Sequence, residues 1–496
     1  MSLSLNRNVI FNPPPSLSCE IAVVGSGPGG AITACLLSEA GRDVLLIEEG
    51  PYLALDSCVP FTMEEMIQKY RNGGLTVALG PVRVPYVEGR CVGGGSEINS
   101  GLYHRTPPEI LAHWTRKFQV EALEEKSLLP HFEACERDLN VSYMKGEVPM
   151  ASLKLHEGAQ RLNWKSFEVP RWFSYDEGVD GASTKKGRRQ SMTQTYIPRA
   201  LQAECRLLPG TRVRSLRRKS DPKLWVLDAE RAQLNGTPQT IKIEAESVFI
   251  CAGAVHTPAL LRRSGIKENV GESLRLHPMI KLVAKFPERV NSLHMGVPVH
   301  QVKEFTPRMS FGGSISTPPY LAIHMTDHRP YGDQLLQDWR HMAVYYAATL
   351  SNGRGSIRCL PGYSDPLVRY QITSEDLHEL SEALRKLSEL LFEAGATALY
   401  PSIAKSPRLT SRADLSQLSG PVPRGRTNLM TVHLFSSCPM GEDRRRCAAD
   451  SFGKVHGHDN LYISDASLLC TPPGVNPQGS IMALARRNAL KFLDGR

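Results

Sequence analysis

Apolar residues along the chain fall into short runs and periodic stripes that predict a mixed α/β protein. The apolar runs at 21–24 and 44–47 flank a glycine-rich turn and a helix-like stretch, which predicts a strand, a helix and a second strand. Further short β-rich pieces alternate with turn signals, at 206–208, 223–227, 240–243 and 247–250. Residues 286–370 have weaker periodicity and many His, Met, Pro and aromatic residues, which is typical of a substrate cavity or of irregular packing.

Leucines recur at intervals of three and four residues over 375–394, which predicts an amphipathic helix. Thr373 or Ser374 can cap its start, acidic residues fill its first turn, and Gly395 ends it. We expect the apolar stripe to pack against a sheet, although a partner-binding surface is an alternative use.

The turn after the first apolar run has the spacing of a dinucleotide-binding motif. Gly25 makes the tight turn, Gly27 lets a pyrophosphate approach the backbone, and Gly30 lets helix and strand pack closely. Glu48 ends the second apolar run, where a carboxylate can accept hydrogen bonds from an adenosine ribose. A carboxylate repels a 2′-phosphate, so the pattern disfavours NADP and leaves NAD and FAD open. The alternative is a close-packed turn that binds no ligand.

Composition places the chain among globular proteins, with 41% hydrophobic and 22% charged residues in a total of 496. No run approaches about 18 uninterrupted apolar residues, which argues against a transmembrane segment. The leader 1–18 lacks the apolar core of a secretory signal. The 11 cysteines contain no C-x-x-C pair, which favours a reducing compartment without a disulfide framework. We therefore expect a cytoplasmic protein that holds no metal.

The formal net charge is +9, and its basic clusters lie at 185–189, 212–219 and 444–446. A solvated surface explains such clusters most simply. The alternatives are an anionic substrate, an anionic carrier or partner, or contact with a membrane surface. Aromatic residues are not interleaved with the basic runs, so we expect no binding of nucleic acid.

Five further segments combine glycines with polar residues, and they lie at 89–99, 252–278, 433–441, 461–467 and 474–478. The first contains the run G-R-x-x-G-G-x-S-x-x-N, and the second contains G-A-x-x-T-P and L-x-x-H-P. In this order the segments resemble the glucose–methanol–choline (GMC) oxidoreductase family of FAD enzymes. The neighbourhood of Glu97, Ile98 and Asn99 looks most like the long-chain-alcohol and cholesterol oxidase branch.

The resemblance implies an α/β fold with two domains. A Rossmann-like FAD-binding domain of the GMC type would comprise residues 16–150, 190–285 and 426–496. A second α+β domain, built on an antiparallel sheet backed by helices, would comprise residues 151–189 and 286–425 and bind the substrate.

The resemblance also implies how the cofactor is held. Gly25, Gly27 and Gly30 would hold the FAD pyrophosphate, and Glu48 would hold the adenosine ribose. The other positions that match FAD contacts of the family are Arg90, Gly94, Ser96, Asn99, Val213, Ala252, Asp465, Ala466, Pro477 and Gln478. Some relatives attach FAD covalently through a histidine just before the loop asparagine, but Ile98 stands there, so we expect non-covalent FAD.

His433 matches the family's catalytic histidine, and Asn476 matches its partner, which is a second histidine in other members. The resemblance implies oxidation of a primary or secondary alcohol to an aldehyde or ketone. His433 would act as general base, hydride would pass to flavin N5, and O2 or another acceptor would reoxidise the flavin. An anionic or carrier-linked alcohol stays open as the substrate. The alternatives on the same fold are a flavin-containing lyase or isomerase and a light-driven decarboxylase.

Other reactive side chains are given structural roles at this level. The isolated histidines expected to be structural are His277, His324, His341, His456 and His458. Cys438 has no evident dyad partner and is assigned to packing. Ser436 replaces a glycine that is usual in the family's H-x-x-G-x-C run, which makes the backbone shape at this point a question for the structure.

Overall fold

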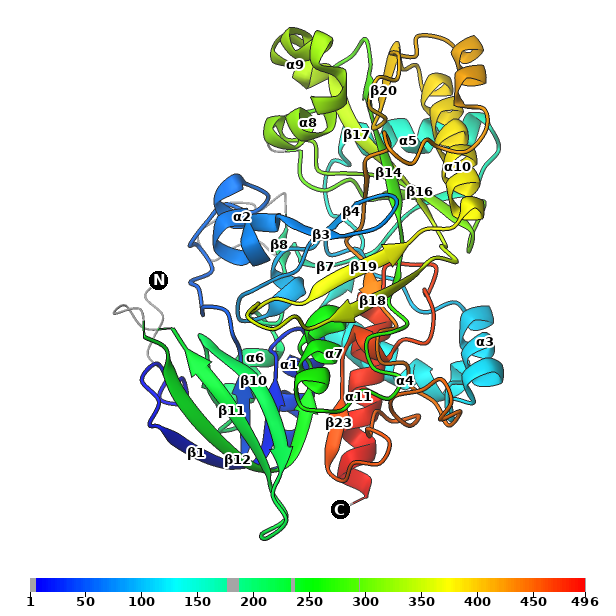
Figure 1. The fold of residues 1–496 in the computed structure, drawn as a ribbon. Coiled ribbons are helices and arrows are strands. Elements are labelled where there is room, and N and C mark those ends of the chain that lie inside the picture. Colours follow the sequence, from blue (N-terminus) through cyan, green and yellow to red (C-terminus); the bar gives the residue numbers. More distant parts are fainter. Residues whose placement is uncertain (1–5, 176–186, 233–236, 294, 496) are drawn as a thin grey trace.

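Two seven-stranded sheets organise the chain in the computed structural model, which describes residues 6–175, 187–232, 237–293 and 295–495. Each sheet forms the centre of one lobe and has its own hydrophobic core (Figure 1). This arrangement confirms the predicted α/β fold with a Rossmann-like part and a second, antiparallel sheet.

The first sheet has the strand order β10-β11-β12-β1-β2-β9, and β23 pairs with β12. The strands are β1 (Ser16–Val24), β2 (Val44–Ile47), β9 (Arg206–Leu208), β10 (Thr211–Arg218), β11 (Trp225–Arg231), β12 (Gln239–Ile250) and β23 (Leu461–Ile463). Pairing is parallel around β1, β2, β9, β12 and β23 and antiparallel among β10, β11 and β12. The helices of this lobe include α1 (Pro28–Glu39), α4 (Glu125–Asp138), α6 (Tyr196–Gln202), α7 (Gly253–Arg263) and α11 (Gln478–Asp494).

Parallel pairing brings the carboxyl ends of several strands to one edge of this sheet. Register pairs Val24 with both Ile47 and Ile250, and Ile250 also pairs with Ile463. The segments that leave these strand ends are those that the sequence singled out. In open α/β sheets, ligands bind outside this edge.

The predicted unit over 20–50 is confirmed as β1, α1 and β2. Gly25 has φ +103°, and a Cβ atom there would lie 2.3 Å from the carbonyl oxygen of Cys251, so only glycine fits this turn. Gly27 is the N-cap of α1 and Pro28 occupies the first turn, where the missing N–H costs no hydrogen bond.

The second sheet has the order β20-β14-β17-β16-β15-β6, and β21 pairs with β14. Its strands are β6 (Ser166–Glu168), β14 (Met279–Lys285), β15 (His300–Val302), β16 (Met309–Gly313), β17 (Met342–Thr349), β20 (Ala398–Pro401) and β21 (Leu429–Met430). Helices α5 (Met150–Arg161) and α10 (Ser374–Glu393) pack on this sheet (Figure 1), and α8 (Pro318–Met325) contacts β14 and β17.

Helix α10 confirms the amphipathic helix predicted over 375–394. Thr373 is the N-cap and forms a capping box with Asp376. The buried leucine stripe of α10 packs against the second sheet, as predicted.

Smaller elements complete the fold. They are α2 (Met63–Lys69), α3 (Pro108–Phe118), α9 (Gly332–Asp338), β3 (Thr76–Ala78), β4 (Val84–Tyr86), β5 (Val141–Ser142), β7 (Arg171–Ser174), β8 (Arg188–Arg189), β13 (Arg275–Leu276), β18 (Arg354–Arg358), β19 (Leu367–Gln371) and β22 (Leu434–Phe435).

The division into domains by residue number stays a prediction. Strand β14 falls within 190–285, which we assigned to the FAD-binding domain, yet it pairs within the second sheet. Part of the segment 151–189, namely 176–186, lies outside the described residues.

Candidate active site

A cavity of about 850 Å3 is lined by residues from both lobes. On one side it meets the carboxyl edge of the first sheet, and on the other it meets one face of the second sheet. Most of the sequence-predicted site residues line it: Gly25, Gly27, Glu48, Gly94, Asn99, Val213, Ala252, His433, Asp465, Ala466, Asn476, Pro477 and Gln478. The structure therefore brings together segments from near the start and near the end of the chain.

The glycine turn presents the N-terminus of α1 to this cavity. A Cβ atom at Gly27 would meet no other atom within 4 Å, so its open side faces the cavity. A Cβ atom at Gly94 would lie 2.8 Å from the Cα of Gly27, which shows how closely the two loops approach. Gly30 does not line the cavity, because a Cβ atom there would lie 1.8 Å from the carbonyl oxygen of Gly25. Gly30 therefore serves packing, whereas Gly27 leaves room for a ligand.

Glu48 is buried and held by the turn that it faces. Its carboxylate accepts hydrogen bonds from the Ser26 N–H (3.0 Å), the Ser26 hydroxyl (2.7 Å) and the Gly50 N–H (2.8 Å). A carboxylate has about four acceptor sites, so Glu48 can also accept hydrogen bonds from ligand hydroxyls.

Asp465 joins two of the segments that the sequence singled out. Its carboxylate accepts from the Gly253 N–H (2.8 Å), at the start of α7, and from the N–H of Ser467 (2.8 Å). Burial raises the pKa of Asp465, and these hydrogen bonds oppose that shift. The contacts hold the loop 465–467 against the N-terminus of α7.

Besides Gly30, two predicted residues lie away from the cavity lining. The Arg90 side chain is exposed. Ser96 is fully buried, and its hydroxyl donates to the Gly93 carbonyl (2.7 Å) and accepts from the Met192 N–H (3.0 Å). Ser96 therefore maintains the shape of the loop whose residues Gly94 and Asn99 reach the cavity.

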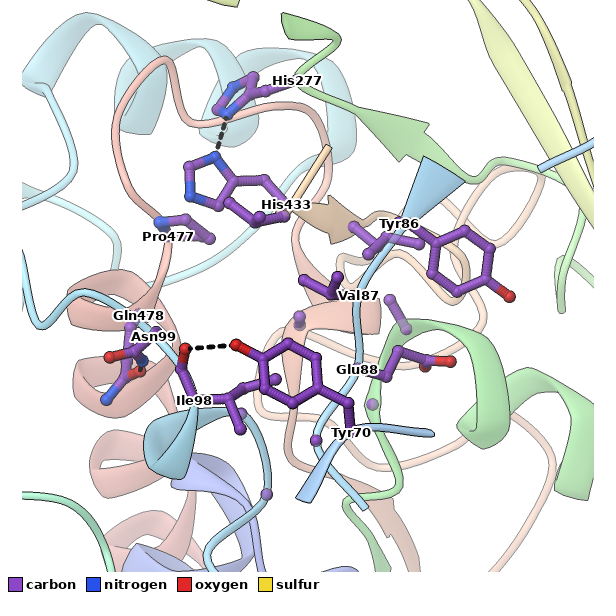
Figure 2. A pocket seen from close by; sticks show the side chains of 18 of the residues that line it. Tyr70, Tyr86, Val87, Glu88, Ile98, Asn99, His277, His433, Pro477 and Gln478 are labelled. Carbon is purple, nitrogen blue, oxygen red and sulfur yellow. Dashed lines mark hydrogen bonds between the residues drawn. The ribbon is translucent and has the colours of Figure 1, made fainter. Parts of the chain in front are cut away.

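His433 lies at the cavity wall between two other segments. Its Nδ1 is 3.2 Å from Nδ1 of His277 (Figure 2), and its Nε2 is 3.5 Å from Nδ2 of Asn476. Asn476 in turn accepts at Oδ1 from the Gln301 amide (3.3 Å). Figure 2 also shows Asn99 beside Gln478, which are hydrogen-bonded to each other, and Tyr70 reaching the carbonyl of Ile98.

These contacts define the protonation of the imidazole. An amide NH2 can only donate, so the Nε2 of His433 accepts from Asn476 and carries the lone pair. The proton of neutral His433 then sits on Nδ1 and is donated to His277. His433 thus presents a basic nitrogen at the cavity wall, beside Asn476.

Electrostatics keep His433 neutral. Burial, followed by the nearby Lys303 ammonium, lowers the pKa of His433 to about 3. The pKa of His277 is also well below its ordinary value because of burial, His433 and Lys303. Burial lowers the pKa of Lys303 itself to about 8. Lys303 forms no ion pair with any residue that the structure describes, so its charge acts on the imidazoles without a compensating carboxylate.

Sequence reasoning missed three of these contacts. His277 was given a structural role, although the L-x-x-H-P run that contains it was a signal of something more specific. Gln301 lies on β15 (His300–Val302) and Lys303 follows this strand; both fall in the segment of weak periodicity, and no sequence signal pointed to them.

Two other expectations concern the segment after His433. Burial raises the pKa of Cys438 above its ordinary value, so this thiol is a poor nucleophile, in line with a packing role. Ser436 has φ +65°, in the left-handed region that favours glycine. The backbone therefore takes a glycine-like conformation despite the substitution.

No helix in the described ranges is both long and apolar enough to cross a lipid bilayer.

Comparison with known proteins agrees with this architecture. Models of the GMC oxidoreductase family match residues 66–279 and 351–485, and a model of the NAD(P)-binding Rossmann-like domain matches residues 23–57. An uncharacterized GMC-type oxidoreductase of Sinorhizobium fredii, y4nJ, is 37% identical over 97% of this chain and 95% of that protein. The long-chain-alcohol oxidase FAO4A of Arabidopsis thaliana is 25% identical over 99% of this chain and 70% of that protein.

Among solved structures, pyridoxine 4-oxidase from Mesorbium loti has the same fold, with a TM-score of 0.72 and 18% identity over 96% of this chain and 99% of that chain. The family models together cover more than half of the sequence, and y4nJ matches almost all of it. The chain therefore belongs to the GMC oxidoreductase family and is an oxidoreductase.

Proposed function

We propose that this protein is an FAD-dependent oxidoreductase that converts a primary or secondary alcohol to an aldehyde or ketone. The observation that carries the proposal is the neutral His433 imidazole, whose Nε2 lone pair lies at the cavity wall 3.5 Å from the Asn476 amide. A general base and an amide donor at one point are what removal of a hydroxyl proton requires. The name of FAO4A, a long-chain-alcohol oxidase, supports the same class of substrate.

The residues present fit FAD. The N-terminus of α1 offers N–H groups to a pyrophosphate, and Gly27 leaves the space beside them open. Glu48 and Val213 line the cavity where an adenosine would lie, and Asn99, Pro477 and Gln478 line it where an isoalloxazine would lie. When bound, FAD supplies the two-electron acceptor at N5 for the carbinol hydride.

The chain's own residues manage the proton and the geometry. His433 accepts the substrate hydroxyl proton at Nε2, and Asn476 donates a hydrogen bond to the developing alkoxide. His277 accepts the Nδ1 proton of His433 and so fixes the ring orientation. Lys303 keeps His433 unprotonated before the reaction and favours release of the proton after it. O2 or another acceptor completes the cycle.

We infer that FAD is bound without a covalent link. Ile98, at the position where some relatives carry the linking histidine, is buried and offers only an aliphatic side chain. No bond to a flavin can form from such a side chain.

The test is an anaerobic screen of alcohols with wild-type protein and the variant His433→Ala, following bleaching of the flavin absorbance. We expect flavin reduction to slow by on the order of a hundredfold or more in the variant, because it lacks the base. His378, an exposed histidine on α10, supplies the control His378→Ala, which we expect to match wild type. Equal reduction rates in His433→Ala and wild type would remove His433 from the mechanism.

A further inference from the structure

The substrate-binding face of the second sheet carries a buried lysine that the proposed reaction does not use. Lys281 lies on β14 and is 9% exposed. Met279 and Lys281 lie on the same face of β14, and both line the cavity together with His277, which lies two residues before the strand. The ammonium of Lys281 therefore lies in the same cavity as the imidazoles, farther along β14.

The contacts of Lys281 leave its charge uncompensated. Its Nζ donates to Nε2 of His324, on α8, at 3.4 Å, and no carboxylate in the described ranges pairs with it. Asp327 also lines the cavity, but it accepts from the Asn428 amide at 2.6 Å and forms no ion pair with Lys281. Two of the three ammonium protons are thus left without a protein acceptor, and burial lowers the pKa of Lys281 to about 8.

Ser402 supplies a second unsatisfied donor at the same place. It follows β20, and its N–H donates to the carbonyl of Lys281 at 2.9 Å, so the two residues are neighbours across the sheet. The Ser402 side chain is 3% exposed and lines the cavity, and its hydroxyl has no hydrogen-bond partner. Buried donors without acceptors are costly, and an anion would satisfy both.

Lys285, a second lysine of β14, differs from Lys281 because it has a carboxylate partner. It lies four residues beyond Lys281 on the same face of β14, does not line the cavity, and pairs with Asp338 at 2.5 Å. Within the described residues, Lys285 is therefore paired with a carboxylate, whereas Lys281 is not.

We propose that Lys281 and Ser402 form a subsite that binds an oxyanion, a carboxylate or a phosphate ester, carried by the alcohol substrate, and that His324 orients the Lys281 ammonium by accepting one of its hydrogen bonds. All three residues belong to the second lobe, whereas the glycine turn that fits the cofactor pyrophosphate belongs to the first. The identity of the ligand as substrate rests on the proposed alcohol oxidation, while the oxyanion subsite itself does not.

The distance between His277 and Lys281 limits the length of a substrate that reaches both ends of the cavity. His277 lies two residues before β14 and Lys281 lies within it, so four positions along the chain, at about 3.3 Å each, place their Cα atoms at most roughly 13 Å apart. A substrate that reaches both His433 and Lys281 therefore carries its oxyanion at the end opposite its carbinol. Hydroxy acids with the two groups on adjacent carbons are too short.

The first experiment compares ω-hydroxy carboxylates and ω-hydroxyalkyl phosphates of graded length with neutral alkanols of equal length. The readout is the ratio of kcat/KM for the anionic alcohol to that for the neutral one. We expect the longer anionic compounds of one series to be preferred by wild type, and the ratio to fall by on the order of tenfold or more in Lys281→Met. Ser402→Ala should lower the ratio by a smaller factor, and Lys285→Met should leave it unchanged.

A second measurement needs no turnover. Alkanoates and alkyl phosphates that lack a hydroxyl should raise the Tm of the holoenzyme, and this increase should be lost in Lys281→Met. If Lys281→Met does not fold, the same loss is expected, in part, for Ser402→Ala. The series that gives the preference and the Tm increase, carboxylate or phosphate, identifies the oxyanion.

Each failure has a distinct meaning. If neutral alcohols are oxidised but anionic ones are not preferred, or if Lys281→Met keeps the wild-type ratio, the subsite is wrong and the proposed function stands. If no alcohol is oxidised, the proposed function fails, and the Tm measurement decides the subsite. An increase in Tm that is equal in wild type and Lys281→Met, or no increase at all, overturns the subsite.

Discussion

Protonation of His433 depends on side chains that approach it from separate segments. His277 accepts the Nδ1 proton, Asn476 donates to Nε2, and Lys303 adds a positive charge near the ring. The first two contacts select the tautomer, and the third opposes protonation. Burial, followed by the Lys303 charge, lowers the pKa of His433 to about 3, so the base is unprotonated at neutral pH.

The first prediction concerns Lys303→Met, which removes the nearby positive charge. Burial lowers the pKa of His433 most and the Lys303 charge lowers it further, so loss of Lys303 should raise that pKa part of the way toward the ordinary histidine value. As the pH falls, His433 would then become protonated, and so stop acting as a base, at a higher pH than in wild type. The acid limb of the pH profile of kcat/KM should therefore move to higher pH.

Lys165 offers a matched control for this variant. It is an exposed lysine whose carbonyl accepts from the Lys303 N–H at 2.9 Å, so it is adjacent but does not face the imidazoles. Lys165→Met should leave the acid limb in place. An acid limb that stays put in Lys303→Met, or moves to lower pH, would contradict the electrostatic role of Lys303.

At the scale of elements, two glycines of the turn between β1 and α1 differ in their surroundings: Gly30 is closely packed, whereas Gly27 borders the cavity. Gly30 is needed because the helix passes too close to the carbonyl of Gly25 for any side chain. Gly27 has no such neighbour, and its φ of −63° suits any residue. The motif spacing predicts these two roles, and the space around each glycine agrees with them.

The second prediction compares Gly27→Ala with Gly30→Ala. Gly30→Ala should lower the Tm even of the apoprotein, at a cost of about 1–3 kcal/mol or more, because the new methyl overlaps a backbone oxygen. Gly27→Ala should leave the apoprotein Tm nearly unchanged. Its methyl would stand where a pyrophosphate approaches the helix, so FAD affinity should fall by at least about tenfold. Equal FAD affinity in Gly27→Ala and wild type, measured by flavin fluorescence titration, would place the pyrophosphate elsewhere.

At the scale of the whole molecule, the cavity is lined by both lobes, so a cofactor bound there would contact residues far apart in the chain.

Ion pairs also connect distant parts of the chain. Arg212, from one of the basic clusters, pairs with Glu49 and with Asp365, so this member of the cluster is held in ion pairs. In the cluster at 185–189, residues 185 and 186 lie outside the described residues.

The third prediction concerns removal of the cofactor from the whole protein. Acid precipitation should leave the yellow flavin in the supernatant, because Ile98 provides no atom for a covalent link. The apoprotein should have a lower Tm than the holoenzyme, since a ligand at about 100 times its Kd stabilises the folded state by about 2.7 kcal/mol. Added FAD should restore the Tm. A yellow pellet would show a covalent link and contradict non-covalent binding.

Features with local signals could be predicted from the sequence. The β1–α1–β2 unit and helix α10 were predicted because their apolar period, caps and glycines lie within a few residues of one another. His433 and Asn476 were identified as candidates because each lies in a recognisable segment. Local signals do not depend on how distant segments pair.

The tertiary structure alone decided which distant side chains meet. His277 contacts His433 across 156 positions, and Lys281 meets His324 and Ser402 only because β14 pairs with β20 beneath α8. Strand β14 falls within the range expected for the FAD-binding domain although it pairs within the second sheet, because its seven residues carry no signal of their sheet partners. The sequence by itself determined the family and identified the candidate cofactor-binding turn and the candidate base. The protonation of that base and the uncompensated lysine beyond it depend on burial and on pairing across the sheet, which only the folded chain decides.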